Sequence, residues 1–240
     1  MISKKRYPEL DALRGIAVLM MVLYHLLFDL SHFYNFDINV TGILGRTFAM
    51  GTATLFLIVI GICFMISWQR SQKYKKHIRR GLIIFTGGMV VSFVTYLMTP
   101  DAFVKFGILH LIGVGALLQP LFVKLRHWNA LFGALLIVIG AFVMQKTVTS
   151  SLLFLFGLRS SNFESLDYYP LLPWFGVVLI GMSIGSLLYV PLQRSALAKI
   201  TNLPYPKPIL FAGRKALIIY FVHQPLILLI LISILGTPIT

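Results

Sequence analysis

The stretch that decides the fold is Asp11–Leu30, DALRGIAVLMMVLYHLLFDL, where an Arg, a His and two Asp residues interrupt an otherwise apolar segment. Its length suits a transmembrane helix, because about 20 mostly apolar residues are needed to cross a bilayer core. Charged side chains at that depth are costly and usually face a bundle interior or a wet cavity. The stretch therefore predicts a membrane helix with a polar face.

The same apolar pattern recurs along the whole chain. Hydrophobic residues make up 58% of the 240 residues and charged residues only 12%, whereas soluble domains are about half apolar and a quarter charged. We predict an all-α, polytopic membrane bundle of about seven transmembrane helices, with residues 1–240 forming a single domain. The predicted spans are 9–32, 42–68, 80–99, 104–123, 129–146, 170–190 and 210–235.

The basic residues predict how the chain is oriented in the membrane. The net charge is +14, and the Lys and Arg residues lie mostly in short segments between spans. Sixteen of them fall on the segments assigned to the inside, and the four assigned to the outside are Arg46, Lys105, Lys146 and Arg159. The positive-inside rule then predicts an N-in, C-out chain. This loop pattern also argues against nucleic acid as a partner.

Polar side chains of the first span share one face. At 100° per residue, five of them fall within a sector of about 60°: Asp11, Arg14, His25, Asp29 and His32. Asp29 lies one turn after His25, where a carboxylate can orient an imidazole and raise its basicity. A histidine held in this way is a common general base. Asp11 and Arg14, three residues apart, are explained equally well by an ion pair.

Other spans carry isolated polar groups at a similar depth. We expect His110 of the fourth span and His223 of the seventh to lie in the outer half of the bundle. Asp167, Tyr168 and Trp174, at the start of the sixth span, are expected at the same level. The alternatives are helix–helix hydrogen bonds for the two histidines and an interfacial aromatic belt for the aromatic residues. No close ligand spacing such as HExxH is present, so we predict no metal.

Two segments between spans carry a possible role. The basic stretch 69–81, QRSQKYKKHIRRG, fits a topology signal that also attracts anionic lipids. It equally fits a cytosolic site for a phosphate-rich donor, with Arg79 and Arg80 as the clamp. The outer connection 147–169 contains an apolar part too short to span, and we interpret it as an interfacial or re-entrant segment that forms a lid.

Four blocks of the sequence carry a family resemblance. They are PELDALRGIAVLMMVLYHLLFDL, FGILHLIGVGALL, DYYPLLPWFGVVLIGMSIG and FAGRKALIIYFVHQPLIL. In this order they resemble the bacterial branch of the heparan-α-glucosaminide N-acetyltransferase catalytic-domain family. The block LRGIAVLMMVLYH, together with Arg79 and Arg80, also resembles the type-3 acyltransferases.

The resemblance implies a multi-pass enzyme of the bacterial cytoplasmic (inner) membrane. It would move an acetyl or other acyl group from cytosolic acyl-CoA, typically acetyl-CoA, to a carbohydrate or glycolipid acceptor on the far side. His25 matches the histidine of the Arg-x10-His pattern of type-3 acyltransferases, and Arg14 matches its arginine. His25 would then be the general base or a carrier of the acyl group. Arg79 and Arg80 match the pair associated with the CoA phosphates.

The expected site residues fall into three groups. The catalytic candidates are His25, Asp29, His110 and His223. The candidates for acetyl-CoA binding are Arg14, Arg79 and Arg80. The candidates for acceptor binding are Asp167, Tyr168, Trp174 and His32, the last a loose counterpart of the active histidine of the lysosomal branch.

Two other functions fit the same polar residues. One is a transporter or flippase of small polar solutes, since polar side chains in spans also line substrate paths. The other is a non-catalytic membrane partner or sensor. Membrane lipid is an expected partner in every case, and self-association into a homo-oligomer is left open.

Overall fold

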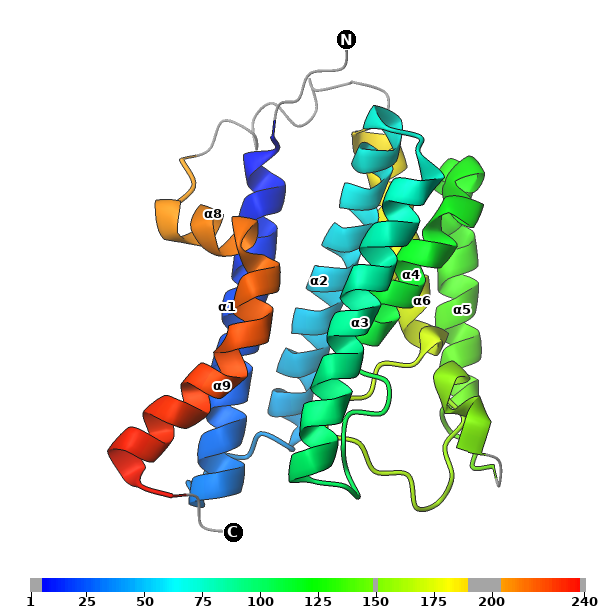
Figure 1. The fold of residues 1–240 in the computed structure, drawn as a ribbon. Coiled ribbons are helices and arrows are strands. Elements are labelled where there is room, and N and C mark those ends of the chain that lie inside the picture. The colour runs from blue at the N-terminus through cyan, green and yellow to red at the C-terminus, as the bar shows by residue number, and fades with distance from the viewer. Residues whose placement is uncertain (1–5, 149–150, 190–203, 238–240) are drawn as a thin grey trace. The chain divides into compact units, whose positions relative to one another are not determined.

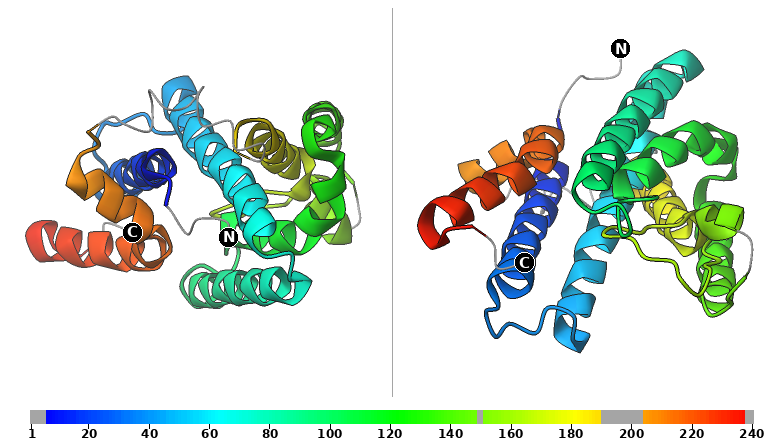
Figure 2. Two further views of the ribbon diagram at one scale, coloured as in Figure 1. Left: turned by 90° about the horizontal axis from the view of Figure 1, so that it is seen from above. Right: turned by 60° about the horizontal axis from the view of Figure 1, so that its bottom comes forward.

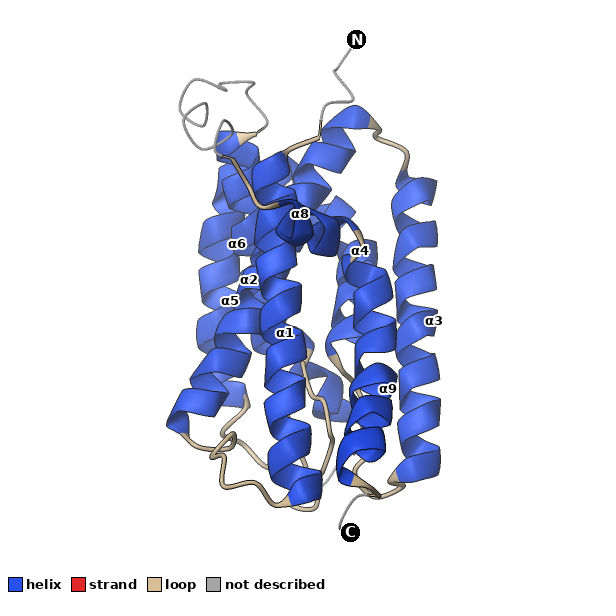
Figure 3. Cartoon of the chain, turned by 90° about the vertical axis from the view of Figure 1, so that its left-hand side faces the viewer, coloured by secondary structure: helices blue, strands red, loops and turns tan. Residues whose placement is uncertain are grey.

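The structure, a computed structural model, describes residues 6–148, 151–189 and 204–237. Over these residues it consists of helices and loops (Figure 3), which confirms the predicted all-α class. The α-helices are α1 (Pro8–Tyr34), α2 (Ile43–Arg70), α3 (Tyr74–Met98), α4 (Ile108–Phe122), α5 (Asn129–Val143), α6 (Leu171–Leu188), α8 (Lys207–Arg214) and α9 (Ala216–Leu235). Two 3-10 helices are η1 (Val123–Trp128) and η2 (Ser151–Phe156).

Six stretches in the described part of the chain are long and apolar enough to cross a membrane, so the chain is a multi-pass membrane protein. One of them is the 36-residue run Ile108–Val143, in which the chain reverses direction at η1 (Figure 1). The reversal occurs at Arg126, whose φ is 49°. Because α4 and α5 are thereby separate helices of 15 residues each, the predicted number of about seven spans is close.

The residue contacts divide the chain into two compact units. The first comprises residues 1–56 and 197–240, and the second comprises residues 57–196. Helix α2 contributes its first half to the first unit and its second half to the second. Each unit is described by itself below.

In the first unit, α8 and α9 pack against α1 (Figure 1). The approach of α8 to α1 depends on two glycines, because a Cβ on Gly213 would collide with the carbonyl oxygen of Asp11 and one on Gly15 with that of Ile209. Glycine at such points lets two helix backbones touch. The first residue of α1 and the last of α9 lie at opposite ends of this unit, as an N-in, C-out chain requires.

In the second unit, glycines again mark the closest helix contacts. Gly133 of α5 faces Gly176 of α6, so that a Cβ on either would meet the carbonyl oxygen of the other. These two helices lie side by side in both Figure 1 and Figure 2. Gly181 of α6 packs against the backbone of Ile58 on α2. Small residues at such contacts allow membrane helices to approach closely.

The loops at one end of the second unit are bonded to each other. The backbone N–H of Tyr169 donates to the carbonyl of Phe106 (2.9 Å), and that of Leu166 donates to the carbonyl of Ala102 (2.7 Å). The N–H of Lys105 donates to the Ser165 hydroxyl (3.1 Å). The predicted outer connection is therefore anchored to the α3–α4 loop, and its apolar part forms the short helix η2. Its action as a lid stays a prediction.

Candidate active site

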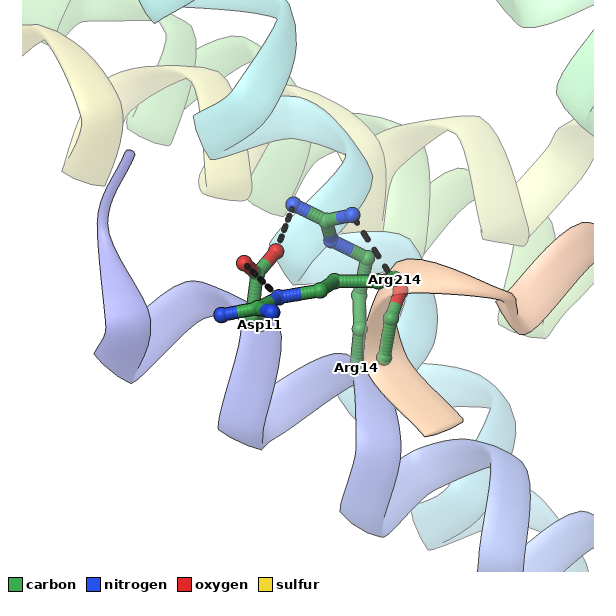
Figure 4. Close-up of polar contacts among 4 residues, drawn as sticks. Asp11, Arg14 and Arg214 are labelled. Carbon is green, nitrogen blue, oxygen red and sulfur yellow. Dashed lines mark hydrogen bonds and ion pairs between the residues drawn. The ribbon is translucent and has the colours of Figure 1, made fainter. Parts of the chain in front are cut away.

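An ion cluster joins the start of α1 to α8. The buried carboxylate of Asp11 lies 3.1 Å from Nη2 of Arg14 and 3.6 Å from Nε of Arg214 (Figure 4). Nη1 of Arg14 also donates to the carbonyl of Gly213 (3.4 Å). The predicted ion pair between Asp11 and Arg14 is thus confirmed, and it is part of a contact between two helices.

Two short sequence patterns underlie this cluster, and their meaning becomes clear only from the contact between α1 and α8. Arg14–Gly15 on α1 and Gly213–Arg214 on α8 are the same dipeptide in opposite order. The glycines allow the backbones to meet, and the arginines then reach Asp11 from both sides. The charge pattern of the sequence predicts for Arg214 only a role in orienting the chain in the membrane.

Glu9 is a further acidic side chain at the start of α1. It is buried, with 4% of its surface exposed, and neither of its carboxylate oxygens has a hydrogen-bond partner in the part of the chain that is described. Its position in the first helical turn is favourable for a negative charge, because the helix dipole is positive there. Nothing in the sequence pattern singled this residue out.

Farther along α1, His25 lies beside His223 of α9. Their ring centroids are 4.8 Å apart and the rings are nearly perpendicular, at 80°. Nδ1 of His25 is 2.9 Å from the carbonyl oxygen of Met21, and Nδ1 of His223 is 2.7 Å from that of Tyr220. A carbonyl oxygen only accepts hydrogen bonds, so each Nδ1 carries a hydrogen, and in the neutral ring each Nε2 then carries a lone pair. We call these two residues the histidine pair.

Asp29, one turn after His25 on α1, and Gln224, directly after His223 on α9, bridge the same two helices. The fully buried Asp29 accepts from Nε2 of Gln224 at 2.9 Å through each carboxylate oxygen. This differs from the expected contact, in which Asp29 orients His25. The carbonyl of Met21, one turn earlier on the same helix, holds the imidazole instead. Gln224 was not predicted as a site residue, although a Gln in an apolar span beside a His is a usable signal.

His110 belongs to the second unit, and both of its ring nitrogens are bonded there. Nδ1 accepts from the backbone N–H of Gly107 (3.2 Å), so Nε2 carries the hydrogen and faces the Ser92 hydroxyl (3.3 Å). The Ser92 hydroxyl in turn donates to the carbonyl of Val104. This closed set of bonds fixes the start of α4. We therefore leave His110 out of the proton transfer proposed below, and its catalytic role stays a prediction.

The other candidates of the second unit lie in or next to its loops. Oδ2 of Asp167 accepts from the backbone N–H of Ile108 (3.0 Å), and burial raises the pKa of Asp167 to about 6. The Tyr168 hydroxyl donates to the carbonyl of Phe154 (2.6 Å), and burial raises its pKa to about 12. Trp174 is buried on α6. A role for these three residues in acceptor binding stays a prediction.

Asp167 should make the stability of the protein depend on pH. Its pKa of about 6 lies above the value of about 3.9 of an unfolded Asp, so the folded state holds the proton more tightly. Apparent Tm in detergent should accordingly fall as the pH rises from about 4 to about 6 and then level off. Asp167→Asn, which keeps an acceptor for Ile108, should reduce this slope. An unchanged slope in the variant would contradict the assignment.

The remaining candidates lie on helix surfaces. Arg79 and Arg80 are exposed near the start of α3. His77, one turn earlier, is buried with its ring against Phe64 (centroids 5.0 Å apart), a placement the sequence did not reveal. His32 is exposed on α1. In the described residues, no group of three or more His, Cys, Asp or Glu side chains is placed to hold a metal ion.

Comparison with known families identifies the chain. Residues 6–225 match the family model described as heparan-alpha-glucosaminide N-acetyltransferase, catalytic. The match covers most of the sequence and includes parts of both units, so the chain belongs to this family of membrane acetyltransferases. The family resemblance of the four sequence blocks is therefore confirmed, and the bacterial branch stays a prediction. Neither the curated proteins nor the solved structures contain a significant match.

Proposed function

We propose that this protein transfers an acetyl group from cytosolic acetyl-CoA to a carbohydrate or glycolipid acceptor on the far side of a bacterial cytoplasmic membrane. The family supports acetyl transfer, and enzymes of this kind use acetyl-CoA as donor in general. The observation that carries the proposal is the hydrogen bond of His25 Nδ1 to the carbonyl of Met21, which leaves Nε2 of the neutral ring available to accept a proton within a membrane helix.

His25 has the properties of the general base that this reaction needs. Its Nε2 takes the proton from the acceptor oxygen or nitrogen, which forms a bond to the acetyl carbon. The bond between that carbon and sulfur breaks, and the proton passes to the CoA thiolate. If His25 instead carries the acetyl group on Nε2 between two half-reactions, rapid acid quenching should trap acetyl-histidine on the protein.

The direct test is transfer of label. Purified protein in lipid vesicles would receive radiolabelled acetyl-CoA and saccharides extracted from the bacterial envelope. We expect labelled saccharide and free CoA in equal amounts. Absence of both transfer and CoA binding would overturn the proposal, and solute flux without use of acetyl-CoA would indicate a transporter.

At the donor end, Arg79 and Arg80 are proposed to bind the CoA phosphates. We assign Arg14 to the contact between α1 and α8, because Asp11 and the carbonyl of Gly213 already engage its guanidinium. Exposed neighbouring guanidinium groups suit phosphate well, since each offers several N–H donors in a planar fork.

Replacing Arg79 and Arg80 together by Ala should raise KM for acetyl-CoA by about 10-fold or more, because a hydrogen bond to a charged group contributes about 1.5–3 kcal/mol. The kcat should change much less, since these residues do not touch the reacting atoms. Initial rates at varied acetyl-CoA concentration measure both constants. Lys124→Ala, which removes an exposed basic side chain from η1, is the control and should leave KM unchanged. An equal effect of both changes would point to general charge rather than a site.

A further inference from the structure

We propose that His223 is a second proton-transfer residue, acting with His25 as one unit in the acetyl transfer. This inference rests on the proposed function and deepens it.

The Nε2 atom of His223 is an unsatisfied acceptor. The residue is buried, with 7% of its surface exposed, and Nε2 has no hydrogen-bond partner within the described part of the chain. Its tautomer is fixed, because Nδ1–H donates to the carbonyl of Tyr220. An unpaired buried polar atom costs about 1–3 kcal/mol. A donor for this nitrogen is therefore expected in some state of the working protein.

His25 becomes that donor when it takes up a proton. In the resting tautomers both Nε2 atoms are acceptors, so the two rings cannot bond to each other. After His25 accepts the acceptor's proton, its Nε2 carries a hydrogen. The His223 ring, 4.8 Å away between centroids, is close enough to receive it after a modest rotation. The reaction itself thus supplies a hydrogen-bond donor to the buried Nε2 of His223.

The bonds and protons of the proposed transfer balance without any further reactant. The acceptor's O–H or N–H bond breaks, and its proton goes to Nε2 of His25, where Nε2 of His223 shares it. The acceptor atom bonds to the acetyl carbon, and the carbon–sulfur bond breaks. The thiolate sulfur then takes the shared proton, which restores both neutral imidazoles. A neutral partner suits this depth, because a second carboxylate would cost much more to bury than an imidazole.

The surrounding contacts keep the two rings next to each other. Each Nδ1 is bonded to a carbonyl of its own helix, which leaves each Nε2 on the side of the ring away from that carbonyl. The bridge between Asp29 and Gln224 joins α1 to α9 beside the pair, because Gln224 directly follows His223. The histidine pair is thus built into a rigid contact between two helices of the same unit.

A double-mutant cycle tests whether the two residues act as one unit. The variants are His25→Gln, His223→Leu and the double variant, assayed for kcat and for KM of acetyl-CoA. Residues that act as a unit show strongly non-additive losses, so we expect each single change to lower kcat by roughly 100-fold and the double variant to be only slightly slower. KM should stay within about 2-fold, because neither residue is proposed to bind CoA. Independent, multiplying losses would overturn the inference.

A conservative variant separates this role from a packing role. His223→Gln keeps a side-chain oxygen that can accept from His25, so it should regain part of the kcat lost in His223→Leu. Equal losses in the two variants, or a wild-type kcat in His223→Leu, would overturn the inference. His127→Gln, a change at an exposed histidine of η1, is the matched control and should retain full activity.

The outcomes also distinguish the inference from the proposed function. A wild-type protein that neither binds acetyl-CoA nor transfers acetyl would overturn both. A wild-type protein that transfers acetyl, with a His223→Leu variant equally fast, would overturn only the role of His223. Apparent Tm and acetyl-CoA binding of each variant show whether a lost rate reflects misfolding, in which case the Gln variant decides.

Discussion

Replacing His25 by Ala should lower the rate of acetyl transfer by about 100- to 10,000-fold, the usual contribution of a positioned general base. The change removes the Nε2 lone pair that accepts the acceptor's proton. It leaves the bridge between Asp29 and Gln224 intact, so the contact between α1 and α9 should persist. The measurement is the initial rate with radiolabelled acetyl-CoA at saturating concentration.

The control for this variant is Leu23→Ala on the same helix. Leu23 is exposed, at 47% of its surface, and contributes no polar group to the histidine pair. It should reduce the rate little, because it changes an exposed apolar position of the same helix. A His25→Ala protein that works as fast as the wild type would show that another group is the base.

Local patterns account for most of what the sequence predicted correctly. Long apolar runs gave the helical membrane class, because each run is sufficient by itself to form a span. The ion pair between Asp11 and Arg14 followed from three-residue spacing within one helix. On α1, Asp29 is buried and His25 is half-buried, as the shared polar face predicted, whereas His32 at the end of that face is exposed. Such features depend on neighbours within one or two helical turns.

Contacts across the fold could not be predicted in the same way. Asp29 binds Gln224, which is 195 residues away in the chain, and this leaves His25 to a backbone carbonyl. Sequence spacing placed Asp29 one turn from His25, and only the position of α9 shows that Asp29 bonds to Gln224 instead. The bonds of His110 to Gly107 and Ser92 likewise depend on how α3 meets α4, so the sequence did not reveal them.

The division into spans depended on a different signal. An apolar run does not reveal where it turns back, and the reversal at Arg126 falls within basic and aromatic residues that could also belong to a longer helix. The predicted spans 104–123 and 129–146 nevertheless place the break correctly. The basic residues between them supplied the signal, because charges collect where the chain leaves the membrane.

The second large effect is expected at Gly213, where α8 touches α1. A Cβ at this position would overlap the carbonyl oxygen of Asp11, which is backbone and cannot rotate away. Gly213→Ala should therefore push the helices apart and weaken the contacts of Asp11 with Arg14 and Arg214. Overpacking of this kind typically costs about 1–3 kcal/mol. For a chain of this size we expect a fall in apparent Tm of roughly 2–4 °C per kcal/mol, measured by thermal unfolding in detergent.

Gly51→Ala provides a matched control for this prediction. Gly51 also lies within a helix of the first unit, on α2, but a Cβ there would meet no atom within 4 Å. Alanine favours a helix over glycine by about 1 kcal/mol, so this variant should keep or raise the apparent Tm. If both variants lowered the apparent Tm equally, helix contact through Gly213 would not be the cause. If Gly213→Ala alone lowered it, the reversed Arg–Gly dipeptides of α1 and α8 would be established as the contact that joins these helices.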